Sequence, residues 1–136
     1  MAKHVWTMCC ENAIVDARTN NVTLISLVEQ LNVPARAPFI AVRLVIGSLW
    51  EREAAGPDAF KCRFSWQGPQ EHQSSSVADF KGEIEGDKRR SRVFVEVHRL
   101  DFRGQGNYHL VTELQDAEGA WNPLSTYRVE VVQLPD

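Results

Sequence analysis

Long apolar runs are absent from this sequence. No window approaches the roughly eighteen uninterrupted apolar residues that a membrane-spanning helix needs, which excludes such a span. The first residues, Met1 to Trp6, lack a long apolar segment followed by a small-residue cleavage site, so we expect a cytoplasmic protein without a membrane partner. Cysteine is also scarce. Cys9, Cys10 and Cys62 are an odd number without metal-ligand spacing, as expected of reduced thiols in a reducing compartment.

The sequence has no excess of positive charge. The 15 lysine and arginine residues are outnumbered by 18 aspartate and glutamate residues, and the net charge is −3. A domain that binds nucleic acid usually has a basic balance, because it must neutralise phosphates. We therefore expect no nucleic-acid partner.

The residue patterns of common metal and cofactor sites are missing too. No His-x-His or Cys-x-x-Cys occurs, which gives no signal for zinc. Calcium-binding loops need clustered aspartates, whereas here they are isolated from one another: Asp58, Asp87, Asp101 and Asp116. Gly104 and Gly106 precede a strand, whereas a phosphate-binding loop leads into a helix. We expect no metal and no cofactor.

The composition is that of a folded protein. With 136 residues, of which 43% are hydrophobic and 24% charged, the chain is long enough to bury one core, and we expect a single domain over residues 1–136. Apolar residues alternate with polar ones in most segments, as in Phe60-Lys61-Cys62-Arg63-Phe64-Ser65-Trp66. This alternation and the spacing of the turns predict an all-β fold: an antiparallel two-sheet β-sandwich of about eight strands, immunoglobulin-like or C2-like.

Two segments of the sequence predict β-hairpins. The first runs from Arg90 to Leu114 around Gly104-Gln105-Gly106 and would place Asp101 opposite His109, with a bulge near His98-Arg99 to align its faces. The second joins residues 4–16 to residues 22–28 through a turn at Asn20-Asn21, and a helical turn or bulge near Glu29 stays open.

The middle of the chain predicts a passage between sheets. Pro34 and Pro38 suit a crossover, and residues 39–49 are apolar on both alternations, as in a central strand, where Gly47 suggests a bulge. A hairpin between this strand and residues 60–66 would bring Trp50 and Trp66 to one end of the sandwich.

Two resemblances to known families support this fold class. Gly106-x-Tyr108-x-Leu110 resembles the glycine-x-tyrosine of immunoglobulin-like sandwiches, whose tyrosine hydroxyl closes a corner onto nearby backbone. Leu110 stands where the usual cysteine would be, so no inter-sheet disulfide is implied. The N-terminal part resembles an uncharacterised family of short bacterial proteins, through Cys9 or Cys10, Ile14-Val15-Asp16, Thr19 to Leu24 and Glu29-Gln30-Leu31. That resemblance implies a bacterial β-sandwich and supplies no catalytic residues.

Aromatic and arginine residues are the best indication of a binding surface. Tryptophan and arginine are enriched at binding hot spots, so we assign binding to Trp50, Arg52 and Trp66, although a tryptophan at a strand end can also close a core. The sequence thus predicts a non-catalytic binding module with a protein partner, including a second copy of itself in a homodimer. A small-molecule or carbohydrate binder that uses the same aromatics is the alternative.

Two further sets of residues could carry a function, namely candidate catalytic side chains and a basic cluster. An enzyme would depend on Cys9 or Cys10 as a nucleophile, or on the Asp101–His109 pair for acid–base chemistry, and we expect neither. The basic cluster Lys88-Arg89-Arg90-Ser91-Arg92 could dock an anionic surface, but such clusters more often protect an adjacent hydrophobic strand from aggregation.

Overall fold

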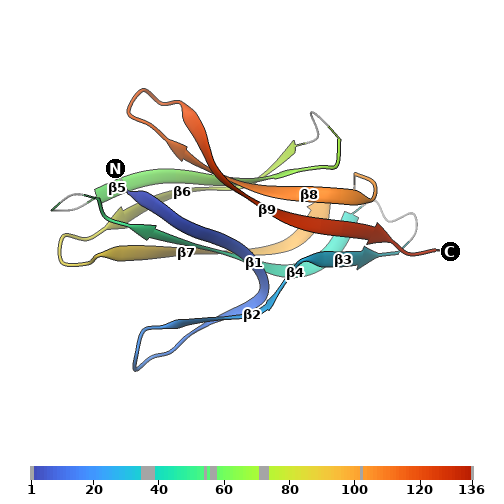
Figure 1. Cartoon of the computed structure of the whole chain (residues 1–136), viewed down its shortest axis with the longest axis horizontal. Helices are drawn as coiled ribbons and strands as arrows, with labels where there is room; N and C mark the ends of the chain where they lie inside the picture. The colour runs from blue at the N-terminus through green and yellow to red at the C-terminus, as the bar shows by residue number, and fades with distance from the viewer. Residues whose placement is uncertain are drawn as a thin grey trace.

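The computed structural model describes residues 2–34, 39–53, 55, 58–70, 74–101 and 103–135. The described residues form nine β-strands and the turns between them, without a helix (Figure 1). The prediction of an all-β protein with two sheets is confirmed. The strands are β1 (Lys3–Val15), β2 (Val22–Leu27), β3 (Gln30–Val33), β4 (Phe39–Glu51), β5 (Asp58–Gln67), β6 (Ser74–Ile84), β7 (Arg90–Asp101), β8 (Gly106–Gln115) and β9 (Trp121–Gln133).

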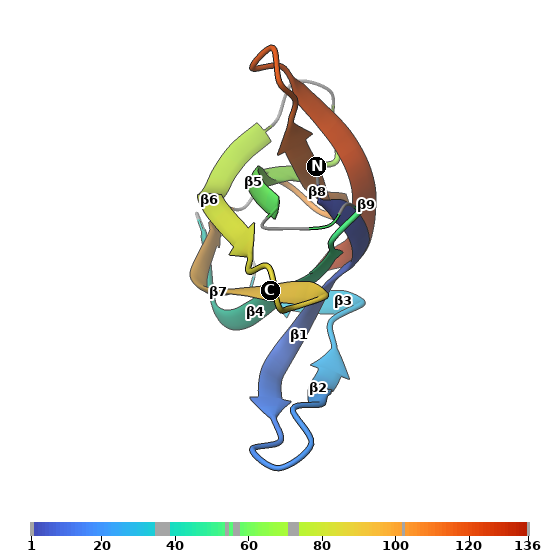
Figure 2. The same cartoon turned by 90° about the vertical axis from the view of Figure 1, so that its left-hand side faces the viewer.

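The strands divide into a four-stranded and a five-stranded sheet. The four-stranded sheet has the order β2-β1-β4-β7, and the five-stranded sheet has the order β3-β9-β8-β5-β6. The five-stranded sheet curls strongly when it is viewed end-on (Figure 2). All strand pairs are antiparallel except β3 with β9, which is a parallel pair that the sequence did not predict.

Alternating side chains fill the space between the sheets. On β5 the inward residues Phe60, Cys62, Phe64 and Trp66 are buried, and the residues between them are more exposed. On β4 the side chains of Ile46 and Trp50 are fully buried. The alternation read from the sequence therefore identified the inward face of β5 correctly, because one face of a half-buried strand must be apolar.

Buried hydroxyl groups join the two sheets. The hydroxyl of Thr112 on β8 donates to the hydroxyl of Thr7 on β1 at 2.9 Å, and the Nε2 atom of His4 lies 2.7 Å from the same Thr7 oxygen. Since buried polar atoms cost free energy unless they are paired, this chain of hydrogen bonds fixes the relative position of the sheets.

The predicted hairpin from Arg90 to Leu114 is wrong. β7 pairs with β4, and β8 pairs with β5 and β9, so the two strands belong to different sheets. The connection between them is an arch closed by Tyr108, whose hydroxyl donates to the carbonyl of Gly104 at 2.7 Å and accepts from the amide of Arg103 at 2.6 Å. A glycine-containing reversal has the same local sequence whether it joins neighbours in one sheet or passes between two sheets.

The predicted hairpin between residues 39–49 and 60–66 is also wrong. β4 and β5 lie in different sheets, and Trp50 stacks on Phe60 with ring centroids 4.7 Å apart. Trp66 lies six positions further along β5, about 20 Å away at the rise of a strand. The two tryptophans therefore occupy opposite ends of the core.

The N-terminal hairpin is confirmed. β1 pairs with β2 from Val15–Val22 to Cys10–Leu27, and Asn20 in the connection has a φ of 59°. The turn is longer than the expected Asn20-Asn21 pair, because the Asp16 carboxylate accepts hydrogen bonds from two amides of the connection. Ser26, near the end of β2, has a φ of 55°. After Leu27 the chain leaves the four-stranded sheet and enters the five-stranded sheet as β3.

Two expected bulges have different outcomes. The register of β4 and β7 shifts between Ala41–Arg99 and Leu44–Val97, which is beside the predicted position, although the extra residue lies on β4. The bulge suggested at Gly47 is absent, since the register there is regular. A Cβ atom at Gly47 would lie 3.2 Å from the Phe94 ring, so this glycine makes room for an aromatic side chain.

The passage between β3 and β4 connects the five-stranded sheet to the four-stranded sheet, as the prolines suggested. Pro38 itself lies outside the described residues. Within the described part of the chain, no helix has the length and apolarity that crossing a bilayer requires.

Candidate functional site

The two tryptophans assigned to binding from the sequence are core residues. The side chain of Trp50 is 0% exposed and donates from Nε1 to the Ser48 hydroxyl at 2.9 Å. Trp66 is 3% exposed. Neither presents a surface to a partner, because both strand ends are covered by the opposite sheet. The binding role assigned to them stays a prediction, and the structure gives them a packing role.

Arg52 shapes a turn at one end of the molecule. Its guanidinium donates to the carbonyl of Glu85 at 3.2 Å and to the carbonyl of Gly86, and its backbone amide donates to the carbonyl of Arg89 at 3.0 Å. These contacts hold the connection between β6 and β7. Arg52 therefore lies at the candidate surface and fixes the loop that presents the other cations.

The thiols are shielded from solvent. Cys9, Cys10 and Cys62 are all buried, and burial raises the pKa of the Cys9 and Cys62 thiols to about 12. Burial also raises the pKa of Cys10. A cysteine nucleophile needs a thiolate that is accessible and favoured, so these environments work against nucleophilic chemistry.

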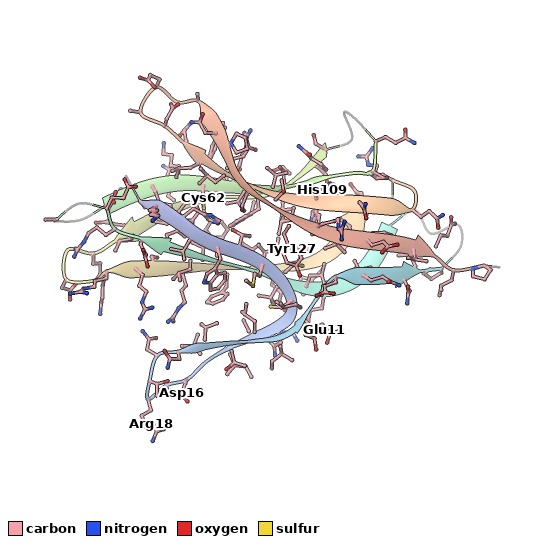
Figure 3. All side chains as sticks on the ribbon, viewed as in Figure 1. Glu11, Asp16, Arg18, Cys62, His109 and Tyr127 are labelled. Carbon is pink, nitrogen blue, oxygen red and sulfur yellow. The ribbon has the colours of Figure 1, made fainter. Side chains whose placement is uncertain are left out.

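The Asp101–His109 pair is not formed. His109 on β8 lies opposite Gln67 on β5 and Arg128 on β9, whereas Asp101 on β7 lies opposite Phe39 in the other sheet. Figure 3 shows His109 on the five-stranded sheet. Within the residues that the structure describes, no group of three or more His, Cys, Asp or Glu side chains could hold a metal ion.

The turn between β6 and β7 carries three exposed cations, Lys88, Arg89 and Arg90, which we call the basic turn. None of the three forms an ion pair with a described residue. The amide of Lys88 donates to the carbonyl of Glu85 at 2.9 Å, so the backbone of the turn is closed while the side chains remain free. Free, solvated cations on a fixed backbone can pair with an external anion without first breaking an internal salt bridge.

The tip of the β1–β2 hairpin lies at the same end of the molecule. The guanidinium of Arg92 on β7 donates to the Oδ1 atom of Asn20 at 3.3 Å and to the Asn20 carbonyl. Arg18 is exposed at this tip, and its side chain extends away from the sheets (Figure 3). The hairpin tip therefore adds an exposed cation, Arg18, at this end of the molecule.

An open groove of about 930 Å³ runs between these loops. Its walls include Asn20, Arg52 and the basic turn, together with the carboxylates Glu51, Glu53 and Asp87. The groove is thus mixed in charge, with its free cations on the protruding turn. A small anion inside the groove would also meet the carboxylates. An extended anion can instead contact the cations of the basic turn from outside.

Comparison with known proteins shows a likeness to solved structures. No protein-family model and no curated protein matches the sequence. Among solved structures, the chain is similar to the Pseudomonas fluorescens alkylpurine DNA glycosylase AlkC bound to DNA containing an abasic site analog, with a TM-score of 0.52 and 10% sequence identity. The match covers 93% of this chain and 30% of the glycosylase chain, so this chain spans less than a third of the length of that protein. At this identity the likeness shows the fold alone.

This comparison corrects two predictions. We expected a non-catalytic protein-binding module and, from the acidic net charge, no nucleic-acid partner. Both predictions are wrong, because a solved protein with a similar fold is a DNA glycosylase bound to DNA. Net charge is a sum over the whole chain and does not report local clusters. Lys88-Arg89-Arg90 is such a local cluster, and clusters of this kind are more often only a solvated flank of a strand.

Proposed function

We propose that this domain binds nucleic acid through its phosphate backbone, with the basic turn as the principal contact. The observation that carries the proposal is the set of free cations on Lys88, Arg89 and Arg90, which have no ion-pair partner among the described residues. Arg18 on the neighbouring hairpin tip extends the same surface. Lysine and arginine side chains supply most of the non-specific affinity for nucleic acid by displacing condensed counterions.

The likeness to a DNA-bound glycosylase supports this function. The matched part is less than a third of the glycosylase chain, so we propose that the fold serves as a nucleic-acid-binding unit that can accompany other domains. We also propose that the two sheets form an immunoglobulin-like sandwich, supported by the corner that the Tyr108 hydroxyl closes onto Gly104.

A binding titration at several salt concentrations tests the function. The triple variant Lys88→Gln/Arg89→Gln/Arg90→Gln should bind a short DNA duplex more weakly, and its plot of log affinity against log salt should be shallower by about 2 to 3, since each phosphate contact on duplex DNA contributes about 0.9. Each substitution removes a charge from an exposed side chain, so the melting temperature should stay nearly unchanged.

The matched control is Arg103→Gln/Arg128→Gln, which removes two exposed cations away from the basic turn. It should leave the salt slope within error of the parent. Equal slopes for the parent and the triple variant would show that the basic turn does not contact phosphates, and the proposal would then fail.

A further inference from the structure

A second charged surface lies on the outward face of the five-stranded sheet. On β5 the side chains of Lys61 and Arg63 alternate with core residues and face away from the other sheet. In the β5–β6 register Lys61 lies directly opposite Lys81. On the other side of β5, Arg63 lies opposite Glu113 of β8. The face therefore holds three cations on adjoining positions of two paired strands, and on β6 Asp79 lies opposite Arg63.

The Lys61–Lys81 pair is unfavourable for the protein alone. Like charges directly opposite each other in an antiparallel pair destabilise a sheet, because their Cβ atoms are only about 5 Å apart. Neither ammonium group forms an ion pair with a described residue. No ion pair therefore offsets the repulsion between these two ammonium groups, and an external anion would relieve it.

Arg63 beside this pair is held in a fixed orientation. Its Nε and Nη2 atoms donate to the two carboxylate oxygens of Glu113 at 3.0 and 3.3 Å. Its guanidinium carbon lies 4.5 Å from the centroid of the Trp121 ring, over the indole. The side chain of Arg63 is still 35% exposed, so one side of this stack is accessible. A planar guanidinium fixed in this way is a platform on which a nucleobase can stack.

A groove of about 760 Å³ adjoins the lysines. It runs between Lys61, Lys81 and Glu83 on one side and the turn between β8 and β9 on the other. In that turn the Asp116 carboxylate accepts hydrogen bonds from the Ala120 amide at 2.9 Å and from the Asn122 side chain at 3.0 Å. The Asp116 carboxylate is thus engaged by hydrogen bonds within its own turn. The other carboxylate that lines the groove is Glu83, two positions from Lys81 on β6.

We propose that this face binds single-stranded nucleic acid, with Lys61 and Lys81 contacting phosphates and a base stacking on the Arg63–Trp121 pair. The inference rests on the proposed function and deepens it by naming the substrate class. Single strands offer unpaired bases to planar side chains, whereas the bases of a duplex are already stacked on one another. The combination of free lysines with a guanidinium–indole stack matches the chemistry of a single strand.

Two probes of equal length distinguish this site from the basic turn. The full chain is titrated with a labelled thymidine oligomer of about 12 nucleotides, a length that single-strand sites accommodate, and with a duplex of the same length. The parent should bind the single strand more tightly. Lys61→Gln/Lys81→Gln should reduce the single-strand salt slope by about 1.4, since each contact contributes about 0.7. Its melting temperature should stay level or rise, because the like-charge repulsion is removed.

Arg63→Lys separates stacking from charge. It keeps the positive charge and removes the planar guanidinium, so it should weaken single-strand binding about tenfold and leave duplex binding unchanged. Arg128→Gln is the matched control, because it removes an exposed cation elsewhere on the same sheet and should change neither affinity.

Each remaining outcome decides between the two proposals. Equal affinity for both probes with no effect of Arg63→Lys would overturn the single-strand site, while a response to the basic-turn variant would still support duplex binding. Failure of the parent to bind either probe at low salt would overturn both proposals. Displacement of the oligomer by poly-glutamate of equal charge would show a general polyanion surface and would also overturn the single-strand assignment.

Discussion

The guanidinium of Arg92 holds the backbone and the side chain of Asn20, a residue 72 positions earlier in the chain. This contact ties the tip of the β1–β2 hairpin to the start of β7, the strand that follows the basic turn. Without it, the hairpin would be held mainly at its base, where β1 continues into the four-stranded sheet. The position of Arg18 relative to the basic turn therefore depends on this single pair of residues.

Removing the Arg92 side chain should loosen the hairpin tip. In Arg92→Ala the free energy of local opening should fall by about 1 kcal/mol, because hydrogen bonds to an exposed charged group contribute modestly. Trypsin should then cut after Arg18 several-fold faster, as followed by mass spectrometry of the native protein. The matched control Asn20→Gly keeps the carbonyl acceptor and the left-handed backbone, and it should fall between the parent and Arg92→Ala. Equal cleavage rates in all three proteins would contradict a tethering role.

Trp50 should be required for stability. Its side chain is fully buried, stacked on Phe60 and hydrogen-bonded to Ser48. Trp50→Ala should lower the free energy of unfolding by about 3 to 5 kcal/mol, the usual cost of removing a large aromatic from a core. Urea denaturation measures this loss. Trp50→Phe retains most of the ring volume and should cost less. A melting temperature that does not change in Trp50→Ala would mean that the tryptophan is available for binding.

His4 should make the protein less stable in mild acid. Burial lowers the pKa of His4 below its usual value of 6.5, and a backbone hydrogen bond to Trp6 opposes this only in part. The unfolded chain then binds a proton more readily than the folded chain. The stability contributed by neutral His4 is present above pH 6.5 and is lost as the pH falls below it.

Urea denaturation measures this loss between pH 7.5 and pH 5, a range that brackets the usual histidine pKa of about 6.5. The decline should be smaller in His4→Gln, which keeps a hydrogen-bonding group near the Thr7 hydroxyl and does not titrate. An identical decline in both proteins would place the acid sensitivity on other groups.

Local structure and the β1–β2 hairpin were predictable from the sequence, whereas the partners of β4, β5, β7 and β8 were not. The alternation of Phe60, Cys62, Phe64 and Trp66 indicated β5 and its inward face, because side chains on a strand point to opposite sides. The same alternation is compatible with pairing inside one sheet or stacking between two sheets. For this reason the arch at Gly104 and the separation of β4 from β5 could not be read from local patterns.

The candidate surfaces were hidden for a related reason. The cluster at Lys88 was visible, but whether its charges are free depends on the side chains that folding brings near. The opposition of Lys61 to Lys81 depends on the register of β5 and β6, and the Arg63–Trp121 stack joins residues on strands that are not neighbours. Tryptophans at strand ends were assigned to binding, although both side chains are buried in the core.

The parallel pairing of β3 with β9 sets an order on biosynthesis. Gln30 on β3 is synthesised 100 positions before its partner Glu130 on β9. Until β9 is synthesised, the backbone of residues 30–33 lacks its hydrogen-bonding partner strand. The side chain of Val33, which is buried in the folded domain, is then not yet fully packed. The nascent domain must therefore wait, partly open, for the final strand to be released before it can close.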